Sequence, residues 1–195
     1  MKSRKIDLIL DGSKEENILL LSFQNTLIDQ ITLNTKKPGS SLVAEISKLL
    51  EKNQFGVENI ENLFIGIGPG SYTGVRVAVS VAEGLSLALN IPLYPFYSNL
   101  AYLPADMEEG PFTLIVKGKH THFLLQGSLS NESISPQITH LILEEDKLSS
   151  YIEKEPKALF LDLEAKLNSS LLLPYLAKIK KQAPNPCKII YLHDF

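Results

Sequence analysis

The stretch with the clearest chemical potential runs from residue 66 to residue 76 and is rich in glycine. It reads GIGPGSYTGVR, follows a short apolar run and precedes a helical pattern. Glycines let the backbone approach a ligand closely, and the free N–H groups at a helix N-terminus attract negative charge. The stretch therefore predicts a candidate phosphate or nucleotide loop that includes Gly68, Gly70, Ser71 and Thr73.

Three familiar phosphate or nucleophile motifs do not fit this loop. A Walker loop needs a lysine after its last glycine, but no lysine occurs between Lys52 and Lys117. The dinucleotide pattern needs a glycine where the sequence has Thr73. The nucleophile elbow needs one residue between Gly70 and Ser71, which are adjacent here. A tight turn selected for close packing is therefore the open alternative.

Two histidines give the strongest hint of a metal. His120 and His122 alternate in a predicted strand, so both imidazoles would point to the same face. No carboxylate or third histidine lies nearby in the sequence, and the single cysteine, Cys187, excludes a site built from several thiolates. We therefore expect solvated histidines and no metal site.

Composition limits the class of protein. The chain has 195 residues, of which 44% are hydrophobic and 21% charged, with a formal net charge of -3. It is long enough for one large domain or two lobes, and too hydrophobic for a disordered chain. The slightly acidic balance argues against a protein that binds nucleic acid alone, and Lys178, Lys180 and Lys181 are typical of a solvated helix face. No export or membrane signal is evident, so we expect a cytoplasmic location.

Hydrophobic periodicity divides the chain into the elements that must position these residues. The first hundred residues predict the order β-β-β-α-β-α-β, the opening of a mixed sheet with crossover helices. The predicted strands there are 6–10, 18–23, 27–33, 63–67 and 92–96, and the predicted helices are 42–50 and 72–90. Weaker patterns predict strands 113–117, 121–128, 137–143, 157–161 and 188–192 and a helix over 169–181. A breaker-rich link separates an N-terminal lobe, 1–103, from a smaller C-terminal lobe, 104–195.

The helix after the glycine loop carries two apolar seams instead of one. The first seam repeats at spacings of four and three and consists of Gly74, Ala78, Val81, Leu85 and Ala88. A helix that covers one sheet face needs a single apolar stripe, so two seams predict burial from both sides. A helix deep inside one domain and a helix that receives a partner chain both fit this pattern. In the second case, Leu42, Ile46 and Leu49 of the preceding helix complete the interface.

A long run from residue 65 to residue 100 resembles the signature of the TsaB family of tRNA threonylcarbamoyladenosine biosynthesis proteins, which is also called YeaZ-like or glycoprotease-like. The run reads IGIGPGSYTGVRVAVSVAEGLSLALNIPLYPFYSNL. The shared features are a GPGSFTG-like loop, an arginine after it, a small-residue helix with Gly-Leu, an Ile-Pro strand and a Ser-x-Leu helix start. The resemblance implies an actin/Hsp70/sugar-kinase-like (RNase H-like) α/β fold of mixed sheets and crossover helices, with two lobes of which the second is reduced.

The resemblance also implies a subunit without catalytic residues. TsaB-like proteins pair with TsaD, a paralogous transferase, and associate with the ATPase TsaE. Together they place a threonylcarbamoyl group on the adenosine beside the anticodon of tRNAs that read codons beginning with A. The pairing uses the two helices of the N-terminal lobe, and the same surface supports a homodimer. We therefore expect tRNA contact only through the complex, and no membrane contact.

Kinase-like relatives of this family direct the first hairpin at nucleotide phosphates, which adds Asp11 and Ser13 to the candidate phosphate loop. In this sequence Glu15 and Glu16 follow that turn and would repel phosphate. No cofactor is therefore expected, and ATP or ADP at the loop stays an alternative. Three other functions are left open by the resemblance: a nucleotide-binding phosphotransferase, a glycoprotease-like metallohydrolase and a homodimeric chaperone-like module.

Overall fold

Two β-sheets form the framework of the protein. The computed structural model describes residues 4–34, 42–117, 121–131, 133–154, 158–161, 166–184 and 186–190. The larger sheet contains β1 (Ile6–Asp11), β2 (Glu16–Phe23), β3 (Thr26–Asn34), β4 (Ile60–Gly66) and β5 (Leu93–Phe96), in the order β3-β2-β1-β4-β5. The smaller sheet contains β6 (Gly110–Lys117), β7 (Thr121–Ser130), β8 (Ser133–Glu144) and β9 (Ala158–Phe160), in the order β8-β7-β6-β9.

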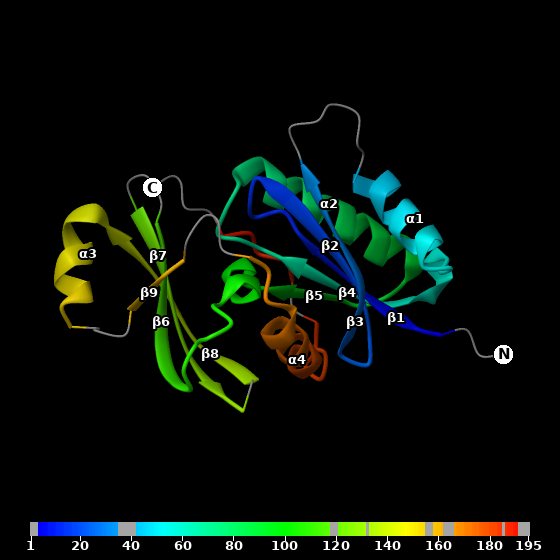
Figure 1. The fold of residues 1–195 in the computed structure, drawn as a ribbon. Coiled ribbons are helices and arrows are strands. Elements are labelled where there is room, and N and C mark those ends of the chain that lie inside the picture. The colour runs from blue at the N-terminus through cyan, green and yellow to red at the C-terminus, as the bar shows by residue number, and fades with distance from the viewer. Residues whose placement is uncertain are drawn as a thin grey trace.

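Helices cover the sheets on distinct sides. Two of them, α1 (Leu42–Lys52) and α2 (Tyr72–Leu89), lie on one side of the larger sheet, and α3 (Glu145–Ile152) flanks the smaller sheet (Figure 1). The last helix, α4 (Ser169–Ile179), lies between the two sheets (Figure 1). Short 3₁₀ helices, η1 (Val57–Asn59) and η2 (Ser98–Tyr102), precede β4 and follow β5. None of the helices in the described part of the chain is long and apolar enough to cross a membrane.

The alternation along β1 places its residues on two faces. Leu10 packs into the core under α1 and α2, whereas Ile9 packs into the core on the opposite face of the sheet. Strands β1 and β4 are parallel, and Leu10 pairs with Ile65. The carboxyl ends of both strands therefore meet at one edge of the sheet, where Asp11 lies beside Gly66.

A second core fills the space between the sheets. It joins Phe64 of the larger sheet to Leu114 and Phe123 of the smaller sheet and to Leu172 of α4, all of which are buried. Helix α4 also contacts η2 and β3, so a segment of the predicted C-terminal lobe packs on the N-terminal one. The division at residue 103 stays a prediction; the link between η2 and β6 lies at that point.

Lys180 follows α4 and forms an ion pair that links this helix to the larger sheet. Its Nζ lies 3.2 Å from Asp7 Oδ2, and Asn62 Nδ2 donates a hydrogen bond of 2.6 Å to Asp7 Oδ1. Asp7 and Asn62 are both buried. The expectation that Lys180 is merely solvated is therefore wrong, because it neutralises a buried carboxylate on β1.

The structure confirms the predicted mixed α/β fold with crossover helices. One helix was not predicted, and one predicted strand is wrong over its described part. Helix α3 was not expected, and the strand predicted over 188–192 is absent from Lys188–Ile190, where the described chain has a single backbone bond from Ile190 N–H to Ile67 O (2.8 Å). Residues 191 and 192 of that prediction lie outside the described residues.

Candidate functional site

The glycine loop packs directly against the turn between β1 and β2. A Cβ atom at Gly70 would overlap the Ser13 carbonyl oxygen and lie 2.6 Å from Ser13 Cβ. A Cβ atom at Gly74 would likewise overlap the Gly12 carbonyl oxygen. These two glycines are therefore required by the close approach of two backbone segments. This contact supports the packing interpretation of the loop.

Several loop amides already have partners within the protein. The Ser71 N–H donates to Ser13 O at 2.6 Å, and the Gly68 N–H donates to Ser98 Oγ at 2.9 Å. Ser71 is also the N-cap of α2, because its Oγ accepts from the Gly74 N–H at 3.2 Å. These donors are the groups that a phosphate would require. Phosphate binding at this loop stays a prediction.

Asp11 is the centre of a buried polar network at the same sheet edge. Its side chain is 2% exposed and accepts hydrogen bonds from Ser98 Oγ (2.7 Å), Tyr102 OH (2.6 Å), Ser13 Oγ (2.8 Å) and the Ser13 N–H (3.3 Å). Burial, together with the charge of Asp11, raises the pKa of Tyr102 far above its ordinary value. The phenol therefore keeps its proton and donates it to Asp11. Four donors compensate the cost of burying this carboxylate.

The structure brings together part of the predicted phosphate loop. Asp11, Ser13, Gly70 and Ser71 meet at the junction of the hairpin and the loop. Thr73 lies exposed on the first turn of α2. Ser98 and Tyr102, the partners of Asp11, were not among the predicted site residues. The signal that could have found them is their place just after β5, which ends at the same sheet edge as β1.

Only one of the two histidines singled out as a metal candidate lies in the described part of the chain. His120 lies outside the described residues, and His122 is 1% exposed. The expectation of a solvated His122 is wrong, because it lies on the same face of β7 as the buried Leu124, which packs with Leu148 of α3. Over the residues that the structure describes, no group of three or more His, Cys, Asp or Glu side chains could hold a metal ion.

The predicted partner interface needs correction at five positions. Each of these residues is buried in the core between the helices and the larger sheet: Leu42, Ile46, Leu49, Gly74 and Ala78. They are not available to a partner because they hold α1 and α2 on their own sheet. Val81 and Leu85 are half-buried, and Ala88 is exposed. The interface itself stays a prediction. Ala88, which was predicted to belong to it, lies on the other side of α2, which faces away from the sheet.

That other side, which we call the outer face of α2, carries exposed apolar and small residues. We define it by Val77, Gly84, Leu87 and Ala88; Arg76, Ser80 and Glu83 of the same helix are also exposed. Val77 is 46% exposed and Leu87 is 86% exposed, and an added Cβ at Gly84 would have nothing within 4 Å. A helix with this composition lets a second backbone approach closely. Ala78 of the predicted seam lies in the same core as Val75 and Val79, so the predicted seams form one buried side of this helix. A partner on its exposed side stays a prediction.

Comparison with solved structures identifies the fold. YeaZ from Pseudomonas aeruginosa is 18% identical, with a TM-score of 0.68 over 93% of this chain and 99% of that one. Among curated relatives, an uncharacterized protein of Mycoplasma pneumoniae, the MG208 homolog, is 38% identical over 40% of this chain and 42% of its own length. The tRNA threonylcarbamoyladenosine biosynthesis protein TsaB of Haemophilus influenzae is 30% identical over 52% of this chain and 43% of its own length. The matched part thus spans less than half the length of these two curated relatives.

A family model supplies the last comparison. The model described as "TsaD: tRNA N6-adenosine threonylcarbamoyltransferase" matches residues 33–149, which is more than half of the chain. This range contains α1, the glycine loop, α2 and the smaller sheet as far as α3. The chain therefore belongs to this family, as a TsaB/YeaZ-like protein.

Proposed function

We propose that this chain is a non-catalytic subunit in tRNA threonylcarbamoyladenosine modification that binds and orients a TsaD-like transferase. The names of its relatives and of its family support the pathway. The target is the adenosine beside the anticodon in tRNAs that read codons beginning with A. The tRNA and a TsaE-like ATPase meet this chain through the complex, and a homodimer is the competing use of the same surface.

The outer face of α2 is the observation that carries the proposal. Leu87, at 86% exposure, is a large apolar side chain placed on a helix whose opposite side already fills the core. Gly84 lies one turn away and has open space around its Cα atom. The protruding Leu87 side chain therefore lies next to a position without a side chain. A TsaD-like partner is a paralogue of this chain and therefore has an equivalent helix pair. Two such pairs can pack face to face in a pseudo-symmetric bundle.

The chemistry at the sheet edge supports a role outside catalysis. Asp11 lies beside Gly66 at the start of the glycine loop, and its four hydrogen bonds hold it inside the protein. A general base or a magnesium ligand needs a carboxylate that substrate or metal can reach. Asp11 is therefore better suited to holding the hairpin and loop together than to chemistry on a substrate.

The double substitution Val77→Asp and Leu87→Asp is expected to abolish binding to the TsaD-like transferase. Both side chains are exposed, so the fold tolerates the change, whereas two carboxylates in an apolar interface are strongly unfavourable. We expect the affinity in a calorimetric titration of the two purified proteins to fall at least about a hundredfold, which is about 2.7 kcal/mol.

Phe160→Asp is the matched control for this titration. Phe160 has the same exposure as Val77, 46%, but lies on β9 in the smaller sheet. Its substitution should leave the affinity within about twofold. Equal affinity of the double variant and the native chain would refute docking through the outer face of α2. Ala78→Arg is unsuitable as a test, because Ala78 is buried and the substitution would disturb folding.

A further inference from the structure

Helix α4 is attached at both of its ends to the part of the chain that carries the larger sheet. At its start, the Asn168 N–H donates to Ala101 O (2.7 Å), and Asn168 Nδ2 donates to Leu103 O (3.0 Å). Ala101 belongs to η2, and Leu103 follows this short helix directly. At its end, Lys180 Nζ lies 3.2 Å and 3.3 Å from the two carboxylate oxygens of Asp7 on β1.

The two attachments lie far apart. Tyr102 of η2 donates to Asp11, the last residue of β1, whereas Asp7 is the second residue of the same strand. Helix α4 has 11 residues and is therefore about 16 Å long. A body held at one place can turn in every direction about it, but a body held at two distant places can turn only about the line that joins them.

Helix α4 also packs on the smaller sheet. It contacts β8, and its Leu172 and Leu176 lie in one buried core with Ile134 of that strand. Because interiors are close-packed, a helix seated in this way moves with the strand that it covers. The two attachments of α4 therefore connect the smaller sheet to the larger one.

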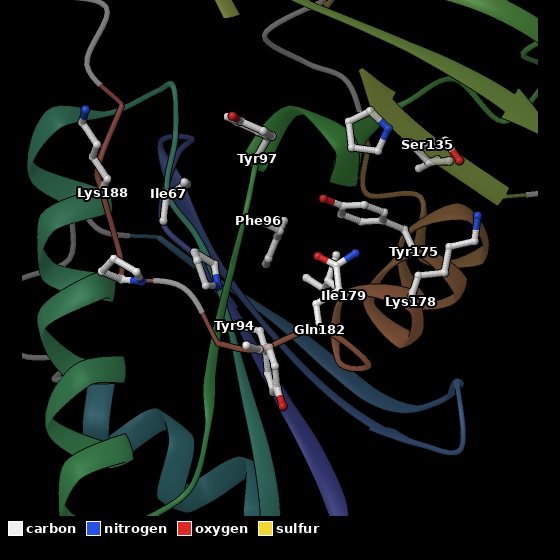
Figure 2. A pocket seen from close by; sticks show the side chains of 15 residues that line it. Ile67, Tyr94, Phe96, Tyr97, Ser135, Tyr175, Lys178, Ile179, Gln182 and Lys188 are labelled. Carbon is white, nitrogen blue, oxygen red and sulfur yellow. The ribbon is translucent and has the colours of Figure 1, made fainter. Parts of the chain in front are cut away.

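A cavity lies beside α4, where β5 and β8 face each other. Its volume is about 410 Å³. Tyr175 and Ile179 of α4 line it together with Phe96 of β5 and Ser135 of β8 (Figure 2). The side chains of β5 and β8 do not fill this space, so direct packing of the two strands does not fix their separation here. We infer this task for the helix that connects them.

We propose that α4 is a strap that fixes the angle between the two sheets, with the ion pair of Lys180 and Asp7 as its lock. Asp7 is buried, and Asn62 Nδ2 donates to the same carboxylate at 2.6 Å, so the acceptor is held in place for Lys180. Breaking the pair leaves α4 and the smaller sheet free to turn about η2. The strap packs on the face of the larger sheet opposite to α1 and α2, so it is independent of the proposed docking role.

Pulsed electron paramagnetic resonance on the full chain tests this proposal. Spin labels at Ala44→Cys on α1 and Ser149→Cys on α3, in a Cys187→Ser background, report a distance across the molecule (Figure 1). The double variant Asp7→Asn and Lys180→Met removes the ion pair and leaves no unpaired buried charge. Its distance distribution should be at least about twice as wide as that of the labelled chain with the pair intact. Amides of α4 should exchange hydrogen at least about tenfold faster.

Lys181→Met is the matched control, because Lys181 is the next residue, carries the same charge and is exposed. It should leave both the distribution and the exchange unchanged. Lys180→Met alone should give an intermediate width, and it keeps the test valid if the double variant does not fold. The proposal is overturned if Lys180→Met keeps the original width, if Lys181→Met widens it equally, or if exchange accelerates as much in α2 as in α4.

Discussion

Asp11→Ala should lower the free energy of unfolding by about 3–5 kcal/mol, because it removes the one acceptor shared by three buried side chains. Ser98 and Tyr102 are 0% and 2% exposed, so their hydroxyl groups could not turn to solvent for a replacement partner. Ser13 would also lose the bond that shapes the turn between β1 and β2. Urea unfolding followed by circular dichroism measures the difference.

Two further substitutions serve as comparisons for the loss of stability in Asp11→Ala. Asp11→Asn keeps the shape and one acceptor oxygen, so its cost should lie between those of the native chain and Asp11→Ala. Asp106→Ala removes an exposed carboxylate and should change stability by less than about 0.5 kcal/mol. If Asp11→Ala proved as mild as Asp106→Ala, the network would not hold the hairpin to the glycine loop.

Gly70→Ala should cost about 2–3 kcal/mol, which is large for the addition of one methyl group. The new Cβ would occupy the position of the Ser13 carbonyl oxygen, and this oxygen accepts the Ser71 N–H bond of 2.6 Å. The loop and the hairpin would have to separate, and the N-cap of α2 would move with them. Thermal or urea unfolding of the purified variant measures the effect.

Gly84→Ala, in the helix that follows the glycine loop, should have the opposite effect on stability. An added Cβ at Gly84 would have nothing within 4 Å, and the residue lies in the interior of α2. Alanine should therefore stabilise the chain by about 0.5–1 kcal/mol, because glycine loses more conformational freedom in a helix. A similar change in stability for Gly70→Ala and Gly84→Ala would contradict the close packing of the loop against the hairpin.

Periodicity was sufficient to locate α1, α2 and α4 but not to show which side of each helix faces the core. The pattern predicted a helix over 72–90, and α2 extends from Tyr72 to Leu89. Gly74 and Ala78 are small and apolar, and such residues suit a close contact with a sheet as well as one with a second helix. Only the position of β4 under α2 shows that they face the core. The partner-facing residues could therefore not be assigned from spacing alone.

The contacts of the candidate site could be predicted from local sequence even less well than the orientation of the helices. The glycine loop could be located from its composition, but its partner is the backbone of a turn more than fifty residues earlier. Ser98 and Tyr102 lie 87 and 91 residues from Asp11 in sequence, and only the order of strands in the larger sheet brings them together.

The threonylcarbamoyladenosine content of tRNA tests the central proposal most directly. In cells depleted of this chain, nucleoside analysis by mass spectrometry should show a strong loss of the modification. Re-expression of the native chain or of Phe160→Asp should restore it, whereas the double variant Val77→Asp and Leu87→Asp, expressed to the same level, should not. An unchanged content after depletion, or full rescue by the double variant, would contradict a subunit that acts by docking the transferase on the outer face of α2.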